Sequence, residues 1–218
     1  LVNEIVWMPE YSKYLAKDFI TSFVKAILDD HIKIAQFHTK KATQNNIQNN
    51  KIQIGEDPFG LPMVLKGNKE TREWHTDWPH DPWAYGGGFK GENIGCLKQP
   101  FPDLTMCIVM VWYLTDVGEN TGGTFCVPKS HKFKKTPRGE KDNISIFSPI
   151  SNEIQINAKA GSVFIQDSRL WHSPPVQLDS SNGDRIAVVN RWTPWWLSIN
   201  DYAPNDRFNV VCKPINKK

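Results

Sequence analysis

The chain of 218 residues carries 26 Lys and Arg against 23 Asp and Glu, a formal net charge of +3 at pH 7. So small an excess argues against nucleic acid or an anionic membrane as the main partner. The hydrophobic share of 39% and charged share of 22% are typical of a globular protein, and the length fits one domain. Fifteen Pro and fourteen Gly argue against a helical bundle. The longest apolar run, Met106 to Leu114, is far shorter than the roughly 20 residues of a membrane-spanning helix.

The four cysteines show no CxxC spacing. They are Cys96, Cys107, Cys126 and Cys212. We interpret them as reduced thiols and expect a cytoplasmic protein. Because the chain begins at Leu1 rather than Met, an N-terminal targeting segment is left open.

Tryptophan is unusually frequent, with nine residues. They are Trp7, Trp74, Trp78, Trp83, Trp112, Trp171, Trp192, Trp195 and Trp196. Because Trp is costly to place without burial or stacking, these residues indicate an aromatic core or the wall of a pocket.

The first 50 residues have a helical and then a polar pattern. Between Tyr14 and Leu28, an apolar residue recurs every fourth position, which predicts one face of a helix. Its members are Leu15, Phe19, Phe23 and Ile27. Gln36–Asn50 is polar and is interpreted as a loop, a poorly packed helix or a mobile flap.

After residue 50 the pattern changes to short strands separated by turns. Thr105–Thr115 is continuously apolar, which predicts a strand buried on both faces. Loops are expected at Trp78–Pro102, rich in Pro and Gly, and at the basic segment Lys129–Asp142. The other strand candidates are Lys51–Ile54, Leu61–Leu65, Arg72–Asp77, Gly123–Val127, Ile154–Ala158, Gly161–Gln166 and Arg185–Trp192.

These elements predict a mainly β protein with flanking helices, built as a sandwich or jelly roll. We expect a single domain over residues 1–218. Residues 1–50 would form a helical and polar N-terminal part, and residues 51–218 the jelly-roll core.

His75-Thr76-Asp77 is the first element with metal-binding chemistry. Residues i and i+2 of a strand point to one side, so His75 and Asp77 can converge. A distant His172 would complete two His and one carboxylate, the facial set of non-haem Fe(II) oxygenases. The alternative without a metal is a His–Asp hydrogen bond at the end of a strand. His80 could replace His172, although Pro79 and Pro82 favour a loop role for it.

The remaining histidines are less suited to the site. His131 lies in a turn, and His31 and His38 are expected to be exposed. Arg185 opens the last strand, and a buried Arg needs an anionic partner such as a carboxylate. A dicarboxylate cosubstrate could bind it, but an exposed strand-start cation is the alternative. Arg191 faces the same side by parity and is the rival.

The order and spacing of four blocks resemble the phytanoyl-CoA dioxygenase family of Fe(II)/2-oxoglutarate-dependent oxygenases, over roughly residues 60–197. The blocks are His75–Asp77, Val111–Lys132, Gly161–His172 and Arg185–Val188. The resemblance implies a double-stranded β-helix of cupin-like type, with Fe(II), 2-oxoglutarate and O₂ as cofactor and cosubstrates.

Carried over by position, the resemblance implies that His75, Asp77 and His172 are the iron ligands and catalytic centre. Cosubstrate-binding residues follow in the same way: Arg185 for the distal carboxylate of 2-oxoglutarate, Trp112 for the pocket wall, and Thr124 and Ser173. The chain departs from the family at Lys129, where a turn Gly is usual, and at Pro174, where a Ser often assists the carboxylate-binding Arg. With these assignments, we interpret most of the tryptophans as a shell around the iron site.

The expected reaction is oxidation of an unactivated C–H of a small-molecule metabolite, with release of succinate and CO₂. Halogenating relatives replace the carboxylate ligand, so Asp77 favours hydroxylation. Substrate contacts are expected from Trp78, His80, Trp83 and Tyr85, with Gln44–Asn50 as a lid. Two other classes stay open: a catalytically silent metal-binding or ligand-binding jelly roll, and a zinc hydrolase using His75, His80 and His172. The sequence makes no prediction of oligomeric state.

Overall fold

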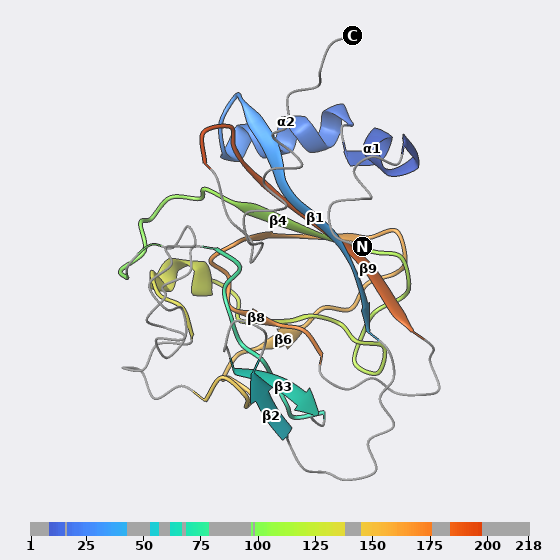
Figure 1. Cartoon of the computed structure of the whole chain (residues 1–218), viewed down its shortest axis with the longest axis vertical. Coiled ribbons are helices and arrows are strands. Elements are labelled where there is room, and N and C mark those ends of the chain that lie inside the picture. Colours follow the sequence, from blue (N-terminus) through green and yellow to red (C-terminus); the bar gives the residue numbers. More distant parts are fainter. Residues whose placement is uncertain are drawn as a thin grey trace.

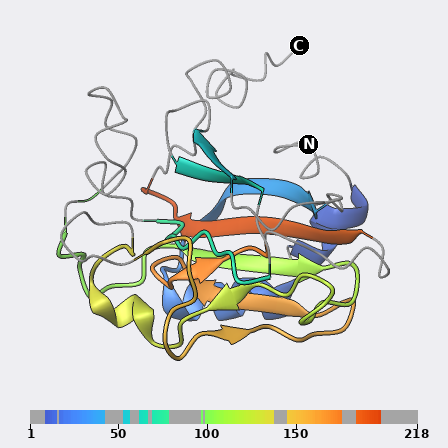
Figure 2. The same ribbon diagram turned by 90° about the horizontal axis from the view of Figure 1, so that it is seen from below.

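The computed structural model describes residues 9–15, 17–42, 53–56, 62–66, 69–78, 97, 99–137, 145–175 and 184–197. Two antiparallel sheets lie face to face in it (Figures 1 and 2). The main sheet has the order β1-β9-β4-β7, and the smaller sheet has the order β6-β5-β8. This arrangement confirms the predicted jelly roll of the cupin-like type.

The main sheet consists of β1 (Ile32–Ala42), β9 (Arg185–Pro194), β4 (Ile108–Tyr113) and β7 (Val163–Asp167). The smaller sheet consists of β6 (Ile154–Gln155), β5 (Phe125–Cys126) and β8 (His172–Ser173). A separate hairpin joins β2 (Gln53–Glu56) and β3 (Pro62–Lys66). A short 3₁₀ helix, η3 (Ser130–Phe133), lies in the predicted basic loop.

The central strand β4 is buried on both faces, as its apolar run predicted. Its alternate residues Val109, Val111 and Tyr113 pack on the inner side, toward the smaller sheet, together with Ala187 and Val189 of β9. The intervening residues of β4 face the other way and pack beneath the helices. This alternation decides which side chains can reach the interior of the jelly roll.

The polar segment that begins at Gln36 is a strand through Ala42, so the predicted loop is wrong for this part. β1 pairs with β9 from Ile32 to Ala42 and is the outer strand of the main sheet. An edge strand has one hydrogen-bonded neighbour, and its position tolerates Lys, Gln and Thr that a central strand would not. The division at residue 50 is also wrong, because the main sheet takes one strand from the N-terminal part.

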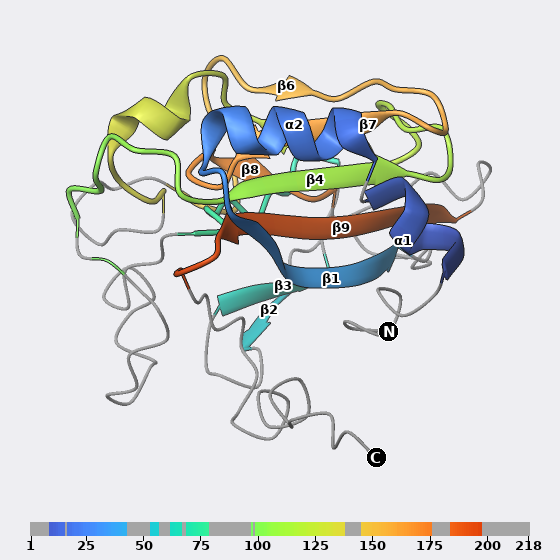
Figure 3. The same cartoon turned by 90° about the horizontal axis from the view of Figure 1, so that it is seen from above.

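Two helices cover the outer face of the main sheet (Figure 3): α1 (Pro9–Leu15) and α2 (Asp18–Ile27). Ile20 and Val24 of α2 are buried against β4 and β9, whereas Phe19 is 77% exposed. The predicted apolar face is therefore wrong beyond Leu15. A step of four residues advances about 40° around a helix, so a period of four drifts away from the sheet.

The chain also leaves the helical conformation between the two helices, at Lys17, which has a φ of −58° and a ψ of 139°. A single continuous helical face from Leu15 onward is therefore not formed. Among the described residues, no helix has the length and apolarity needed to cross a membrane.

Candidate metal centre

The His75 segment lies against β8 through a single β-bridge rather than as a full strand. The His75 main-chain N–H donates to the His172 carbonyl at 3.0 Å, and the His172 N–H donates to the His75 carbonyl at 3.1 Å. The predicted strand Arg72–Asp77 is thus reduced to one bridging residue. That bridge is enough to bring two histidines, 97 positions apart in the sequence, to the same point of the jelly roll.

Asp77 is anchored by the turn that follows β7. The carbonyl of Ser168 accepts hydrogen bonds from the main-chain N–H groups of Asp77, at 2.9 Å, and Trp78, at 3.3 Å. The Ser168 hydroxyl donates in return to the Trp78 carbonyl. With the bridge at His75, these contacts hold both ends of the three-residue motif on rigid parts of the fold.

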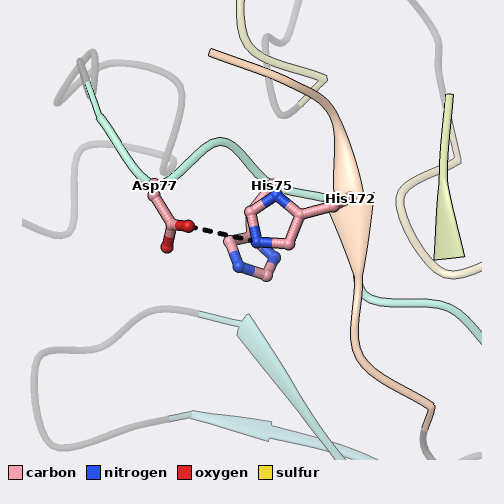
Figure 4. A group of neighbouring side chains, drawn as sticks. All are labelled: His75, Asp77 and His172. Carbon is pink, nitrogen blue, oxygen red and sulfur yellow. Dashed lines mark ion pairs between the residues drawn. The ribbon is translucent and has the colours of Figure 1, made fainter. Parts of the chain in front are cut away.

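The potential ligand atoms of His75, Asp77 and His172 all lie within 4.8 Å of one another. Figure 4 shows the three side chains converging, with His172 coming from β8 and the other two from one extended segment. The imidazole centroids are 4.2 Å apart, and Asp77 Oδ2 is 3.3 Å from His172 Nε2. The arrangement joins two imidazoles and one carboxylate, the donor set of the 2-His-1-carboxylate facial triad.

Both histidines are held in the tautomer that a metal requires. His75 Nδ1 lies 2.8 Å from the Glu73 carbonyl, and His172 Nδ1 lies 3.0 Å from the Leu170 carbonyl. A carbonyl oxygen can only accept, so each Nδ1 carries a proton, and in the neutral imidazole Nε2 is the nitrogen that has the lone pair. Such main-chain acceptors orient metal-binding imidazoles in proteins.

Asp77 is 7% exposed and is ionised by its surroundings. Burial alone would raise the pKa of this carboxyl, but the Arg191 guanidinium and the two nearby imidazoles hold the pKa well below its ordinary value. Arg191 Nη2 donates to Asp77 Oδ1, and Gln166 Nε2 donates to Asp77 Oδ2 at 3.3 Å. The carboxylate is therefore available as an anionic ligand at every pH near neutrality. The donor set, the tautomers and the charge all fit a divalent transition metal.

Arg185 is also buried, at 7% exposure, and lies in a different part of the interior. Its guanidinium carbon lies 5.8 Å from the centroid of the Tyr113 ring, and its Nε has no hydrogen-bond partner among the described residues. Within this part of the chain, no carboxylate forms an ion pair with it. Burial lowers the pKa of Arg185, and Tyr113 opposes that shift. A buried guanidinium without a carboxylate partner fits an anionic ligand.

Two hydroxyl groups complete this second, cationic cluster. The Tyr113 and Thr124 hydroxyls lie 3.0 Å apart, and both residues are buried. Burial raises the pKa of Tyr113, so its hydroxyl stays protonated and can donate. The predicted Thr124 thus contacts Tyr113, and Arg185 lies near the ring of the same tyrosine.

The two arginines of β9, Arg185 and Arg191, have different partners. Both face the interior, as their parity predicted, but Arg191 is paired with Asp77, whereas Arg185 lies beside Tyr113. The predicted rivalry for one anion therefore does not arise, because one arginine already has a carboxylate.

Trp112 is not in the interior, which corrects its predicted position in the cosubstrate pocket. Its Nε1–H donates to Asn190 Oδ1 at 2.7 Å, and its ring packs with the helices on the outer face. The neighbouring Tyr113 takes the inner position because successive residues of a strand face opposite sides. Trp112 and Tyr113 are neighbours in the sequence, and the sequence alone does not determine which of them faces inward.

Ser173 is fully buried, and its hydroxyl both accepts and donates a hydrogen bond to groups other than Arg185. Its hydroxyl accepts from the Glu73 main-chain N–H at 2.8 Å and donates to the Pro174 carbonyl at 2.9 Å. Because His172 faces the metal site, Ser173 as its neighbour on β8 faces the other way. Its observed contacts are with Glu73 and Pro174, and they hold the His75 segment.

The described tryptophans do not form a single shell around the site, which corrects that expectation for them. Trp74 and Trp171 are adjacent in sequence to ligands but pack together with Val127, on the opposite side of their segments. Trp195 is 61% exposed, and Trp196 is exposed beside it. Trp192 packs under α2. Of the described tryptophans, Trp78 packs with the inner-face cluster.

Trp78 is nearly fully buried, so its role includes packing of the interior. His80, Trp83 and Tyr85, and the predicted lid Gln44–Asn50, lie outside the described residues. The residues that sequence reasoning missed are Tyr113 and Gln166. A strand-parity argument anchored on β9 could have indicated Tyr113, but its register with β4 is visible only in the fold.

A jelly roll with two His and one carboxylate at one point of its interior is the architecture of non-haem Fe(II) oxygenases. A family model for phytanoyl-CoA dioxygenase (PhyH) matches residues 62–175, more than half of the chain. The chain therefore belongs to the phytanoyl-CoA dioxygenase family of Fe(II)/2-oxoglutarate-dependent oxygenases.

Curated relatives are more distant and longer. Uncharacterized proteins of Mycobacterium bovis and Mycobacterium tuberculosis are each 27% identical over 148 residues. The matched region is 68% of this chain and 42% of either relative. The chain thus spans less than half the length of the curated relatives that it matches.

Solved structures share the fold at low identity. HygX from Streptomyces hygroscopicus, with nickel, 2-oxoglutarate and hygromycin B bound, has a TM-score of 0.53 and 13% identity, covering 88% of this chain and 67% of HygX. EctD from S. alaskensis, with 2-oxoglutarate and 5-hydroxyectoine, has a TM-score of 0.56 and 13% identity, covering 94% and 61%. The non-heme alpha ketoglutarate dependent epimerase SnoN has a TM-score of 0.54 and 12% identity, covering 93% and 64%.

Proposed function

We propose that this protein is an Fe(II)/2-oxoglutarate-dependent dioxygenase that hydroxylates, or otherwise oxidises, an unactivated C–H of a small molecule. In the hydroxylation, substrate, 2-oxoglutarate and O₂ give the alcohol, succinate and CO₂. The observation that carries the proposal is the pairing of a His-Asp-His donor set with a second buried cation, Arg185, that lacks a carboxylate partner among the described residues. The first suits a metal, and the second suits the far end of a dicarboxylate.

In this proposal His75, Asp77 and His172 hold the iron by two Nε2 atoms and one carboxylate oxygen. Three protein ligands leave three positions of a six-coordinate metal for cosubstrates. Bound iron supplies the reductive activation of O₂, coupled to decarboxylation of 2-oxoglutarate, that yields an oxidant able to take hydrogen from carbon. The protein fixes the donor atoms in advance through the two Nδ1–H contacts and the Ser168 turn.

Arg185, Tyr113 and Thr124 are proposed to bind the distal carboxylate of 2-oxoglutarate. A guanidinium and two hydroxyls provide several donors, and a carboxylate accepts charge-assisted hydrogen bonds from each. The low exposure of all three residues strengthens such bonds, because water does not compete for them.

The walls between the two clusters are apolar. Val109, Val111 and Val189 line the inner face of the main sheet. We propose that this surface keeps water away from the reacting groups, so that oxidation is directed to the substrate.

The carboxylate of Asp77 supports hydroxylation rather than halogenation, because a halide would need the coordination position that this carboxylate takes. Proteins of similar fold include SnoN, a non-heme alpha ketoglutarate dependent epimerase, so hydroxylation is one of several outcomes to test. The product therefore has to be identified by its mass and stereochemistry.

The substrate is proposed to be a small molecule, as HygX and EctD bind hygromycin B and 5-hydroxyectoine in their structures. Contacts from His80, Trp83 and Tyr85 stay predictions. The neutral aromatic rings among them would suit a ring-containing or cationic substrate through stacking or cation–π contact.

The test begins with the anaerobic protein, Fe(II) and 2-oxoglutarate. We expect the visible absorption band of a 2-oxoglutarate chelate on iron, a shift of that band with the correct metabolite, and O₂-dependent succinate formation. His172→Ala should abolish the band and the turnover of 2-oxoglutarate. Full succinate formation by this variant would contradict the proposal.

Two alternatives are separated by the same measurements. A catalytically silent jelly roll would bind metal without forming succinate. A zinc hydrolase would act without O₂, and would need His80 in place of Asp77. Among the described residues, the donor set contains the carboxylate of Asp77 beside two histidines, and this set favours the oxygenase.

A further inference from the structure

The two oxygens of the Asp77 carboxylate have different partners. Oδ1 accepts from Arg191 Nη2, and this contact is a buried ion pair. Oδ2 lies 3.3 Å from His172 Nε2 and accepts from Gln166 Nε2. One oxygen is therefore turned toward the histidine pair, and the other is held by a guanidinium.

The two donors to Asp77 come from opposite sides of the central strand. Val109 of β4 is in register with Arg191 on β9 and with Gln166 on β7. Arg191 and Gln166 thus lie in one row across the main sheet, with Val109 between them. Hydrogen-bonded strands on both sides of β4 give this row a rigid base, so the sheet orients the carboxylate of Asp77 while the Ser168 turn holds its main chain.

A carboxylate can bind a metal through one oxygen or through both. Chelation by both oxygens would occupy a fourth coordination position. Only two positions would then stay free, and a chelating dicarboxylate with O₂ needs three. Arg191 opposes the two-oxygen mode in two ways, because it engages the lone pairs of Oδ1 and its positive charge repels a cation on that side.

We propose that Arg191 is a positioning residue that restricts Asp77 to one-oxygen coordination and thereby keeps a position open for the cosubstrate. The inference rests on the proposed function and goes beyond it. It gives Arg191, the partner of Asp77, a role distinct from the cosubstrate binding proposed for Arg185. Gln166 supports the same orientation from β7.

A simple packing or charge-balancing role makes a different prediction. Losing a buried arginine from an ion pair destabilises the fold wherever it lies. Arg169 offers a matched control, because it is also buried and is ion-paired at 2.8 Å with Asp167, which is not one of the three proposed metal ligands. Only a positioning role changes the binding of 2-oxoglutarate relative to the binding of metal.

The experiment uses the full chain and the variants Arg191→Met, Arg191→Lys and Arg169→Met at pH 8, with folding checked by circular dichroism. Mn(II) affinity is measured by electron paramagnetic resonance. The affinity for 2-oxoglutarate is measured anaerobically from the Fe(II) absorption band. For Arg191→Met we expect Mn(II) affinity within about threefold of the wild type, or tighter. We expect 2-oxoglutarate affinity weakened about 10- to 100-fold, by analogy with the changes in metal affinity or activity that follow loss of a partner of a metal ligand.

Arg191→Lys keeps the charge and should fall between the wild type and Arg191→Met. Arg169→Met should leave both affinities unchanged. The inference is overturned if Arg191→Met binds 2-oxoglutarate as the wild type does, or if it loses both affinities by the same factor. If Arg191→Met does not fold, the same two criteria apply to Arg191→Lys. Absence of the band in the wild type would instead refute the oxygenase proposal itself, and the role of Arg191 with it.

Discussion

His75 and His172 are hydrogen-bonded to each other through their main chains before their side chains meet any ligand. The reciprocal contacts of 3.0 and 3.1 Å form an antiparallel bridge, and the two imidazole centroids lie 4.2 Å apart. The proposed metal site is therefore part of the sheet structure. Its geometry is present in the fold itself, and preorganised ligands lower the cost of binding a metal.

Replacement of Arg185 tests the proposed cosubstrate site. Arg185→Leu removes the buried cation, and we expect the affinity for 2-oxoglutarate to fall about 100-fold, in line with the loss of about 2 to 3 kcal/mol for charge-assisted hydrogen bonds. Mn(II) affinity should be unchanged, because Arg185 does not contact the triad. Titration of the Fe(II) band measures the first quantity. Unaltered binding of 2-oxoglutarate by Arg185→Leu would refute the assignment.

The adjacent residues Tyr113 and Trp112 form a matched pair on opposite faces of β4. Tyr113→Phe loses the hydroxyl beside Thr124, and we expect a loss of about 1 kcal/mol in 2-oxoglutarate binding, or roughly fivefold. Trp112→Phe loses the hydrogen bond to Asn190 on the outer face and should lower stability without changing cosubstrate affinity. The reverse pattern would place Trp112 in the pocket after all.

Ser173→Ala separates a structural role from a cosubstrate role. The variant leaves the buried Glu73 N–H without its acceptor, so we expect the free energy of unfolding to fall by about 1 to 3 kcal/mol. The affinity of the folded protein for 2-oxoglutarate should stay within about twofold, a difference below 0.5 kcal/mol. Chemical denaturation and the band titration give the two numbers. A large loss of affinity with unchanged stability would contradict the structural role.

The two faces of α2 should respond differently to truncation. Val24→Ala removes buried methyl groups and is expected to cost about 2 kcal/mol of unfolding free energy. Phe19→Ala changes an exposed side chain and should cost less than about 0.5 kcal/mol. Urea denaturation of both variants makes the comparison. Equal losses would mean that Phe19 packs against another part of the chain.

Acidification of the metal-free protein should reveal the low pKa of Asp77. Its folded pKa lies well below the unfolded value, so its contribution to stability is present above the unfolded pKa and is lost as pH falls through the folded pKa. Below about pH 4 the unfolding free energy of the wild type should therefore fall more steeply than that of Asp77→Asn, by up to about 1.4 kcal/mol per pH unit. Denaturant titrations between pH 5 and pH 2 would test this, and parallel slopes would refute it.

The sequence by itself determined the class of fold and predicted the set of candidate metal ligands. His75 and Asp77 are two residues apart in one extended segment, and the apolar run of β4 predicted a strand buried on both faces. These are local signals, because the periodicity of a strand relates neighbouring residues directly. His172 and Arg185 were predicted from the order and spacing of the motif blocks along the chain, which resemble those of the family.

Only the tertiary structure decided which face of each element is the inner one. It put Tyr113 rather than Trp112 beside Arg185, paired Arg191 with Asp77, and added β1 to the edge of the main sheet. Each of these outcomes depends on the register and stacking of strands that are far apart in the chain. Local periodicity shows that a strand has two faces, but the packing of the two sheets determines which face holds the site.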